Sequence, residues 1–161
     1  MADTTTIEHI RSLFTYDQLT GLIRSRFGRV VGTRDFEGYV RVSLVHSSTL
    51  RFRAHRLAVL AVLGRWPELD VDHINGIRHD NRWCNLREVS RSTNSQNQRR
   101  ATGNNKTSGL LGVSYDKDRR RWFAQIQTKG KTFNLGRFDS PESAHEAYLN
   151  AKRQLHAGCT I

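Results

Sequence analysis

The sequence predicts an α+β protein in which short β-hairpins and a helix lead into a strand-loop-strand-helix segment, followed by a three-stranded sheet and a helix. Apolar and polar residues alternate in short runs, as is typical of hairpin strands. The apolar run 54–64 ends in Gly, which indicates a buried helix. The segment 99–109 contains one apolar residue among Gly, Asn, Ser and Thr, which is typical of a linker. We therefore expect a first domain over 1–100, a linker over 101–109 and a second domain over 110–161.

The chain is strongly basic. Its 161 residues include 26 Lys and Arg against 15 Asp and Glu, a formal net charge of +11. Residues 1–100 carry 16 Arg and no Lys. Because the planar guanidinium group pairs bidentately with phosphate oxygens, this composition favours a nucleic-acid partner over a membrane surface, and it implies no protein partner.

Several classes of protein are excluded on the same grounds. The length excludes a single large barrel or doubly wound domain. The longest apolar run, Leu57 to Leu63, has seven residues, whereas a membrane-spanning helix needs about 20. The N-terminus lacks the pattern of a secretion signal, and Cys84 and Cys159 lie 75 positions apart outside any zinc-binding pattern. We expect a cytoplasmic protein with free thiols and no structural zinc.

Local signals define the elements of the first domain. Phe14 to Ile23 indicates two short strands around Thr20-Gly21, and Gly38 to Val45 alternates apolar and polar residues. Ala54 to Gly64 is apolar almost all round and is followed by Pro67, which predicts a buried helix of about two turns.

The second domain has clear strand and capping signals. We expect three antiparallel strands, within Leu110–Asp116, Trp122–Thr128 and Lys131–Phe138. Ser140-Pro141-Glu142 predicts the start of a helix, with an N-cap, a proline in the first turn and an acidic residue next to it. The face of this helix that packs on the sheet is expected to comprise Ala144, Ala147, Tyr148, Ala151 and Leu155.

One segment, residues 71–98, concentrates residues suited to catalysis. Asp72 and His73 are adjacent, Asn85 follows after a loop, and Asn94 lies on a helix expected to begin near Ser90. Neighbours on a strand project to opposite sides, so Asp72 can hold a cation while His73 faces a substrate. Asn94 offers an amide oxygen as a second ligand, and such oxygen ligands suit Mg²⁺ or another divalent cation such as Mn²⁺.

The run DHINGIRHDNRWCNLR, followed by SRSTNSQNQR, resembles HNH endonucleases of the phage and homing type. The resemblance extends upstream through FTYDQLTGLI, GYVRV and HRL, covering about Phe14 to Arg99. It implies a ββα-metal (His-Me) finger in which His73 is the general base and Asn85 fastens the loop, with Asp72 and Asn94 as metal ligands. The last letter of the motif is here Asn, which makes a zinc site less suitable than Mg²⁺.

Other polar residues near this motif have more ordinary interpretations. We expect Asp80 and Asn81 to brace the loop through bonds to the backbone, and Cys84 to fill space. His46, His55 and His79 are expected to be structural or solvent-facing. The arginines around the motif are expected to contact phosphates, although a solvated basic face is the alternative; they are Arg78, Arg82, Arg87, Arg91, Arg99 and Arg100.

The C-terminal half, through LGVSYD, RWFAQI, NLGRFDSPESAHEAY and NAKRQLHA, resembles an AP2 DNA-binding domain over about Ser108 to Ala157. Strand alternation turns Trp122, Ala124 and Ile126 towards the helix, and Phe133 and Leu135 likewise on the next strand. Gln and Asn can pair with adenine and Arg with guanine, so the opposite face has base-reading chemistry. The alternative is a small module that binds protein. The expected DNA contacts are Arg119, Arg120, Arg121, Gln125, Gln127, Lys129, Lys131, Asn134 and Arg137.

Together these observations predict a phage-type or mobile-element endonuclease. It would hydrolyse phosphodiester bonds of double-stranded DNA with Mg²⁺, and the AP2-like domain would supply the site preference. If encoded by a phage, it would act in the host cytoplasm or nucleoid. Two alternatives are a DNA-binding regulator with a catalytically silent HNH scaffold and a non-specific packaging or RNA-binding protein.

Overall fold

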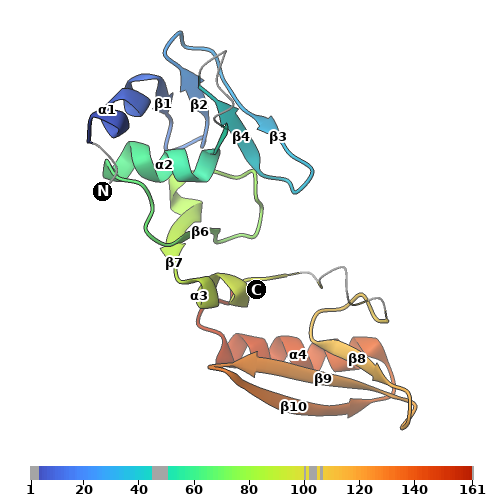
Figure 1. The fold of residues 1–161 in the computed structure, drawn as a ribbon. Coiled ribbons are helices and arrows are strands. Elements are labelled where there is room, and N and C mark those ends of the chain that lie inside the picture. Colours follow the sequence, from blue (N-terminus) through green and yellow to red (C-terminus); the bar gives the residue numbers. More distant parts are fainter. Residues whose placement is uncertain (1–3, 45–50, 100, 102–104, 106, 161) are drawn as a thin grey trace. The chain divides into compact units, whose positions relative to one another are not determined.

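The computed structural model describes residues 4–44, 51–99, 101, 105 and 107–160, and for residues 4–6 the backbone only. Its internal contacts divide the chain into two compact units, Met1–Arg91 and Ser92–Ile161, each of which is described here by itself. Both units combine helices with small antiparallel sheets (Figure 1), so the predicted α+β class is confirmed. The expected division of function between residues 1–100 and 110–161 stays a prediction.

The first unit contains three small antiparallel sheets, β1-β2, β3-β4-β5 and β6-β7. Its elements are α1 (Thr4–Ser12), β1 (Phe14–Tyr16), β2 (Ile23–Ser25), β3 (Thr33–Arg34), β4 (Val40–Ser43), β5 (Arg51–Arg53), α2 (Ala54–Leu63), β6 (Asp70–His73), the 3₁₀ turn η1 (Trp83–Asn85) and β7 (Leu86–Val89). The predicted hairpin at β1 and β2 and the strand at β4 are present. Helix α1 has no counterpart among the sequence predictions, and His46 lies outside the described residues.

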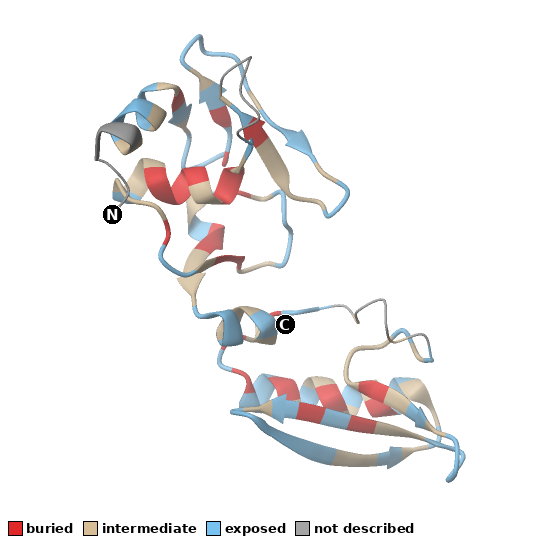
Figure 2. Ribbon diagram, in the orientation of Figure 1, coloured by how far each residue is buried: buried red, intermediate tan, exposed pale blue. Residues whose placement is uncertain are grey.

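Helix α2 forms the centre of the first unit and is its most buried element (Figure 2). Leu57 and Leu60 pack with residues of β1, β2 and β4, whereas Ala58 and Val59 pack against Val71 of β6 and Leu86 of β7. The helix ends at Gly64, which takes a left-handed conformation (φ 71°) that favours glycine and donates its N–H to the carbonyl of Leu60. Burial of both faces of α2 thereby fixes strand β6, which carries Asp72 and His73.

The second unit contains a three-stranded sheet with α4 packed against it. Its strands are β8 (Val113–Asp116), β9 (Arg121–Thr128) and β10 (Lys131–Phe138), in the order β10-β9-β8, and its long helix is α4 (Pro141–Leu155). Short helix α3 (Arg91–Gln96) begins at the junction of the two units. Ser140 caps α4, because its hydroxyl accepts the N–H of Ser143 at 3.1 Å. The predicted strands, cap and helix are therefore present.

Two apolar residues expected in the core of this unit are exposed. Leu155 is 43% exposed because α4 ends there, and Phe133 is 45% exposed although it pairs with buried Ile126. The core comprises Val113, Ala124, Ile126, Ala144 and Tyr148, and on β10 it includes only the partly buried Leu135 and Phe138. The predictions for Leu155 and Phe133 are therefore wrong. Periodicity identified the faces of α4 and β10 that pack together, but not how far along each element the packing extends.

No helix within the described ranges has the length and apolar character that a membrane span requires.

Candidate functional site

Strands β6 and β7 form the scaffold of the candidate site. They pair antiparallel, with Asp72 opposite Arg87 and His73 opposite Leu86, and the loop between the strands returns through the turn η1. Asp72 and His73 are both buried, at the end of β6. A buried carboxylate next to a buried imidazole is costly unless both have polar partners, so those partners define the site.

Asn85 ties the ends of the connecting loop together. Its side-chain oxygen accepts the N–H of Asn75 at 2.9 Å, and its amide nitrogen donates to the carbonyl oxygen of Asp80 at 2.7 Å. The backbone carbonyl of Asn85 also accepts the N–H of Ile74 at 2.9 Å. Asn85 therefore bonds to both ends of the loop, and its role in an HNH site stays a prediction.

Asp80 braces the loop from within. It accepts the side-chain amide of Asn75 at 2.7 Å and two guanidinium donors of Arg82 at 2.8 and 2.7 Å. The Arg82 contact, aided by Asn75, holds the pKa of Asp80 at about 2. Arg82 is thus ion-paired within the loop in this structure, and its expected phosphate contact stays a prediction.

Asn81 sets the orientation of His73. Its side-chain nitrogen donates to the carbonyl of His79 at 3.2 Å, so its oxygen faces Nε2 of His73 at 3.2 Å. Nε2 is therefore the protonated ring nitrogen and Nδ1 carries the lone pair. Burial lowers the pKa of His73, while the bond to Asn81 and the charge of Asp72 act in the opposite direction. The ring is therefore neutral near pH 7, as a general base requires.

Two aromatic rings pack around His73. His55 lies edge-on to it with ring centroids 5.1 Å apart, and Tyr39 lies at 6.0 Å. Burial, followed by the proximity of His73, lowers the pKa of His55 to about 3, so His55 packs as a neutral ring. His79 is exposed. Sequence reasoning missed the contribution of Tyr39 and the bond from Asn81 to His73, because neither follows from spacing along the chain.

Asp72 receives a counter-charge from the opposite strand. The Nε and Nη2 atoms of Arg87 donate to Oδ2 of Asp72 at 3.0 and 2.8 Å. Sequence reasoning predicted that Arg87 contacts DNA phosphates, whereas in the structure it is bonded to Asp72, the predicted metal ligand. A buried carboxylate and an amide oxygen are hard donors that fit a divalent cation such as Mg²⁺. Among the described residues no three His, Cys, Asp or Glu side chains gather as a metal site.

Asn94 lies on α3, whereas Asp72 and His73 lie in the first unit. Six residues are too few for a stable isolated helix, so α3 depends on packing. The last residue of α3 and the two that follow it are bonded to the C-terminal end of α4 and the residues after it. The N–H of Gly158 donates to the side-chain oxygen of Gln96, the hydroxyl of Thr160 donates to Asn97, and the ammonium group of buried Lys152 donates to the carbonyl of Gln98. The helix that carries Asn94 is thereby attached to the second unit.

The face of the second sheet opposite α4 is polar. In the register of β9 and β10, Gln125 pairs with Asn134 and Gln127 with Thr132, and all four side chains are exposed. This matches the outward face expected from strand alternation. The amide side chains stand in a row on adjacent strands, where they could reach base edges.

The basic residues of this unit cluster at its turns. Arg120 and Lys129 adopt left-handed backbone conformations (φ 51° and 49°) in the two hairpin turns. Three other arginines have acidic partners: Arg119 and Arg137 on Asp116, each at 3.4 Å, and Arg121 on Asp139 at 3.2 Å. In the first unit Arg78 donates to the carbonyl of Glu37, and Arg91 is exposed.

Comparison with known proteins supports both the HNH and the AP2 resemblance. Residues 52–96 match the model of the HNH endonuclease family, and residues 108–158 match that of the AP2 domain. The chain belongs to the HNH endonuclease family and carries a C-terminal AP2 domain. It is similar to Protein 3.8 of Escherichia phage T7, with 34% identity over 86 residues, which make up 53% of this chain and 69% of the relative. A solved structure that is also similar to this chain is described as DNA binding and cleavage by the HNH homing endonuclease I-HmuI. The TM-score is 0.47 and the sequence identity 21%, and the match covers 90% of this chain and 88% of the other.

Proposed function

We propose that this protein is a divalent-metal-dependent endonuclease that hydrolyses phosphodiester bonds in double-stranded DNA. The observation that carries the proposal is the buried pair at the end of β6, where neutral His73 is held by Asn81 and adjoins the carboxylate of Asp72. A buried, neutral, oriented imidazole is the arrangement that general-base catalysis uses. A scaffold that served only for binding would not need this arrangement.

In the proposed reaction Nδ1 of His73 accepts a proton from the water that attacks phosphorus, while Nε2 donates to Asn81. Asn85 keeps the loop, and hence Asn81, in place through its bonds to Asn75 and Asp80. The products would carry 5′-phosphate and 3′-hydroxyl ends.

Asp72 and Asn94 would hold the cation, as the HNH resemblance implies. A bound divalent cation would supply positive charge to the crowded phosphorus and to the departing 3′ oxygen. Arg87, bonded to Asp72, would limit the cost of burying that carboxylate before the cation binds. We propose Mg²⁺, or Mn²⁺, because both Asp72 and Asn94 offer oxygen atoms.

The AP2 domain would supply most of the sequence preference. Its outward amide side chains, Gln125, Gln127 and Asn134, would read base edges. The basic turns at Arg119–Arg121 and Lys129–Lys131 would contact phosphates, which contribute affinity without sequence information. The similarity to a phage protein supports action in a bacterial host cell.

Nicking of a supercoiled plasmid tests the proposal. We expect conversion to open-circular or linear DNA with Mg²⁺ or Mn²⁺ and none in EDTA. End-labelling with and without phosphatase should detect 5′-phosphates. Tight plasmid binding without cleavage under any divalent cation would instead support a DNA-binding protein with a silent HNH scaffold.

A further inference from the structure

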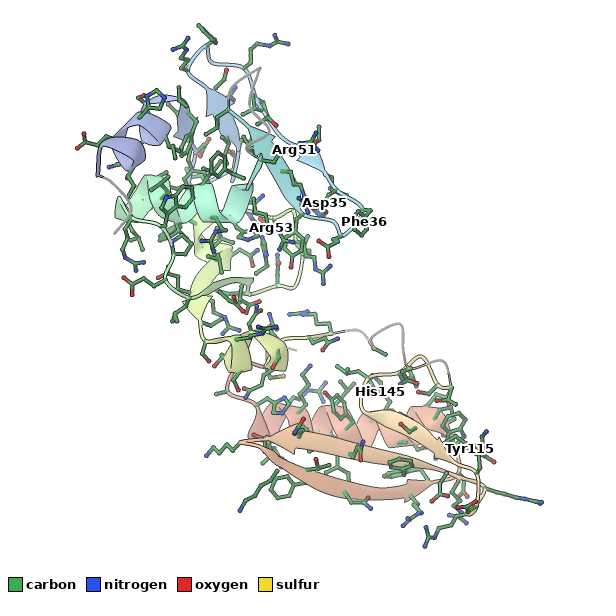
Figure 3. The ribbon with its side chains drawn as sticks, viewed as in Figure 1. Asp35, Phe36, Arg51, Arg53, Tyr115 and His145 are labelled. Carbon is green, nitrogen blue, oxygen red and sulfur yellow. The ribbon has the colours of Figure 1, made fainter. Side chains whose placement is uncertain are left out.

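The hairpin that joins β3 to β4 presents a bare aromatic ring at its tip. Phe36 is 97% exposed, more than any other large apolar side chain among the described residues. Figure 3 shows it at the end of this hairpin, beside Asp35. Exposure of a whole phenyl ring to water is unfavourable, so a hairpin that holds one outward suits contact with a partner.

The tip is rigid. Oδ1 of Asp35 accepts the N–H groups of Glu37 and Tyr39 at 3.0 and 2.9 Å, and its Oδ2 accepts Nε of Arg41 at 2.6 Å. The backbone of Asp35 also donates to the carbonyl of Tyr39 at 2.8 Å. Phe36 therefore protrudes from a turn that its neighbours hold in one conformation, which reduces the entropy lost when the ring is buried by a partner.

The same tip adjoins the loop between β6 and β7, which follows His73. Nη1 of Arg78 donates to the carbonyl of Glu37, the residue after Phe36, at 2.9 Å. The Arg78 guanidinium also lies over the ring of Tyr39, 4.9 Å from its centroid, and that ring is 6.0 Å from the ring of His73. The hairpin tip is therefore linked to His73 through Arg78 and Tyr39.

The surroundings of Phe36 are basic. Four arginines lie on the hairpin, on the neighbouring end of β5 and on the loop between β6 and β7, against the two acids of the hairpin, Asp35 and Glu37: Arg34, Arg41, Arg53 and Arg78. Arg53 stacks over Tyr39 at 4.2 Å and pairs with Glu37 at 3.1 Å. An exposed phenyl ring surrounded by arginines is complementary to stacked bases bordered by phosphates.

We propose that Phe36 is a wedge that enters the base stack of DNA next to the phosphate attacked with the help of His73, and so locally unwinds the duplex. This inference rests on the proposed function for its location, since it assumes that DNA is the substrate at His73. Apolar side chains inserted between base steps unstack them and distort the duplex. The arginines beside the hairpin would then lie along the phosphates on either side of the opened step.

The test measures unwinding of closed circular plasmid by full-length protein in EDTA, so that no strand is cut. A topoisomerase that requires no divalent cation relaxes the complex, and gel electrophoresis gives the change in linking number per bound protein. We expect wild type to lower the linking number, Phe36→Ala to lose most of this change, and Phe36→Trp to retain it. Phe27→Ala is the matched control, because Phe27 is 75% exposed on another hairpin and stacks on Arg26, and it should behave as wild type.

Unwinding by Phe36→Ala equal to that of wild type, or no unwinding by wild type, would overturn the wedge. An equal loss in Phe27→Ala would also overturn it, because any exposed aromatic residue would then suffice. A parallel nicking assay with Mg²⁺ separates this inference from the proposed function. Nicking by wild type without unwinding contradicts only the wedge, whereas absence of nicking contradicts the proposed function.

Discussion

The bond between Asn81 and His73 gives the sharpest prediction about catalysis. Asn81→Ala removes the acceptor for Nε2 of His73 and leaves the backbone at residue 81 held by two other contacts. The hydroxyl of Tyr16 donates to the carbonyl of Asn81 at 2.7 Å, and Gly21 packs directly on that peptide group. The substitution therefore acts on the orientation and tautomer of the imidazole more than on the path of the loop.

The size of the effect follows from the lost bond. A hydrogen bond of this kind contributes about 0.5–1.5 kcal/mol net, which corresponds to a loss of the productive ring state of roughly 2- to 12-fold. Displacement of a catalytic group by about 1 Å can cost ~10²-fold in rate. We therefore expect Asn81→Ala to cleave about 10- to 100-fold more slowly, with DNA affinity unchanged.

Single-turnover nicking measures this rate, and nitrogen NMR of the His73 ring reports its tautomer directly. Asn75→Ala is the matched control, because Asn75 braces the same loop through Asp80 and Ile77 but does not bond to His73. The reasoning would be refuted if Asn81→Ala cleaved within about twofold of wild type. It would also be refuted if Asn75→Ala lost as much activity as Asn81→Ala although the His73 tautomer in Asn75→Ala was that of wild type.

Three further changes test other parts of the account. Gly112→Ala should destabilise the second unit by about 2–4 kcal/mol, measured by urea unfolding, because the added Cβ would lie 2.0 Å from the Tyr148 ring at a φ of 77°; unchanged stability would contradict this packing. In selection on randomised duplexes Gln125→Ala should change the preferred sequence. Arg120→Ala should instead weaken binding to all sequences and reduce the slope of log K against log salt concentration by about 0.9. The reverse result would show that the sheet face does not read bases. Because the pKa of Asp80 is lowered to about 2, its stabilising contribution should be present above about pH 4 and be lost as the pH falls towards 2. The unfolding temperature of Asp80→Asn should therefore depend less on pH in that window than that of wild type. An identical pH dependence would exclude the contribution.

Local signals predicted much of the fold. The alternation in Val40–Ser43, the apolar run closed by Gly64 and the Ser140-Pro141 cap each depend on residues close in sequence. The spacing of polar residues in 71–98 likewise placed Asp72 and His73 on one strand, and the structure shows them at the end of β6.

Contacts between distant residues could not be predicted in this way. The pairing of Arg87 with Asp72 requires the register of β6 and β7, which becomes known only once the loop between them is folded. Lys152 was not expected to be buried, yet its ammonium group donates to the carbonyl of Gln98, 54 positions away. Composition marked 99–109 as a linker, whereas attachment of the segment after α3 to the C-terminal residues is a tertiary contact without a local signal.

Cleavage by His73→Ala tests the central claim most directly. Single-turnover nicking of plasmid in Mg²⁺ and plasmid affinity in EDTA should be measured in parallel on the same preparations. Loss of a general base should slow nicking by ~10² to 10⁴-fold, whereas affinity should stay near that of wild type because the buried ring is not expected to contact phosphate. Nicking by His73→Ala within about tenfold of wild type would contradict this claim, because the protein would then cut DNA without the base at the end of β6.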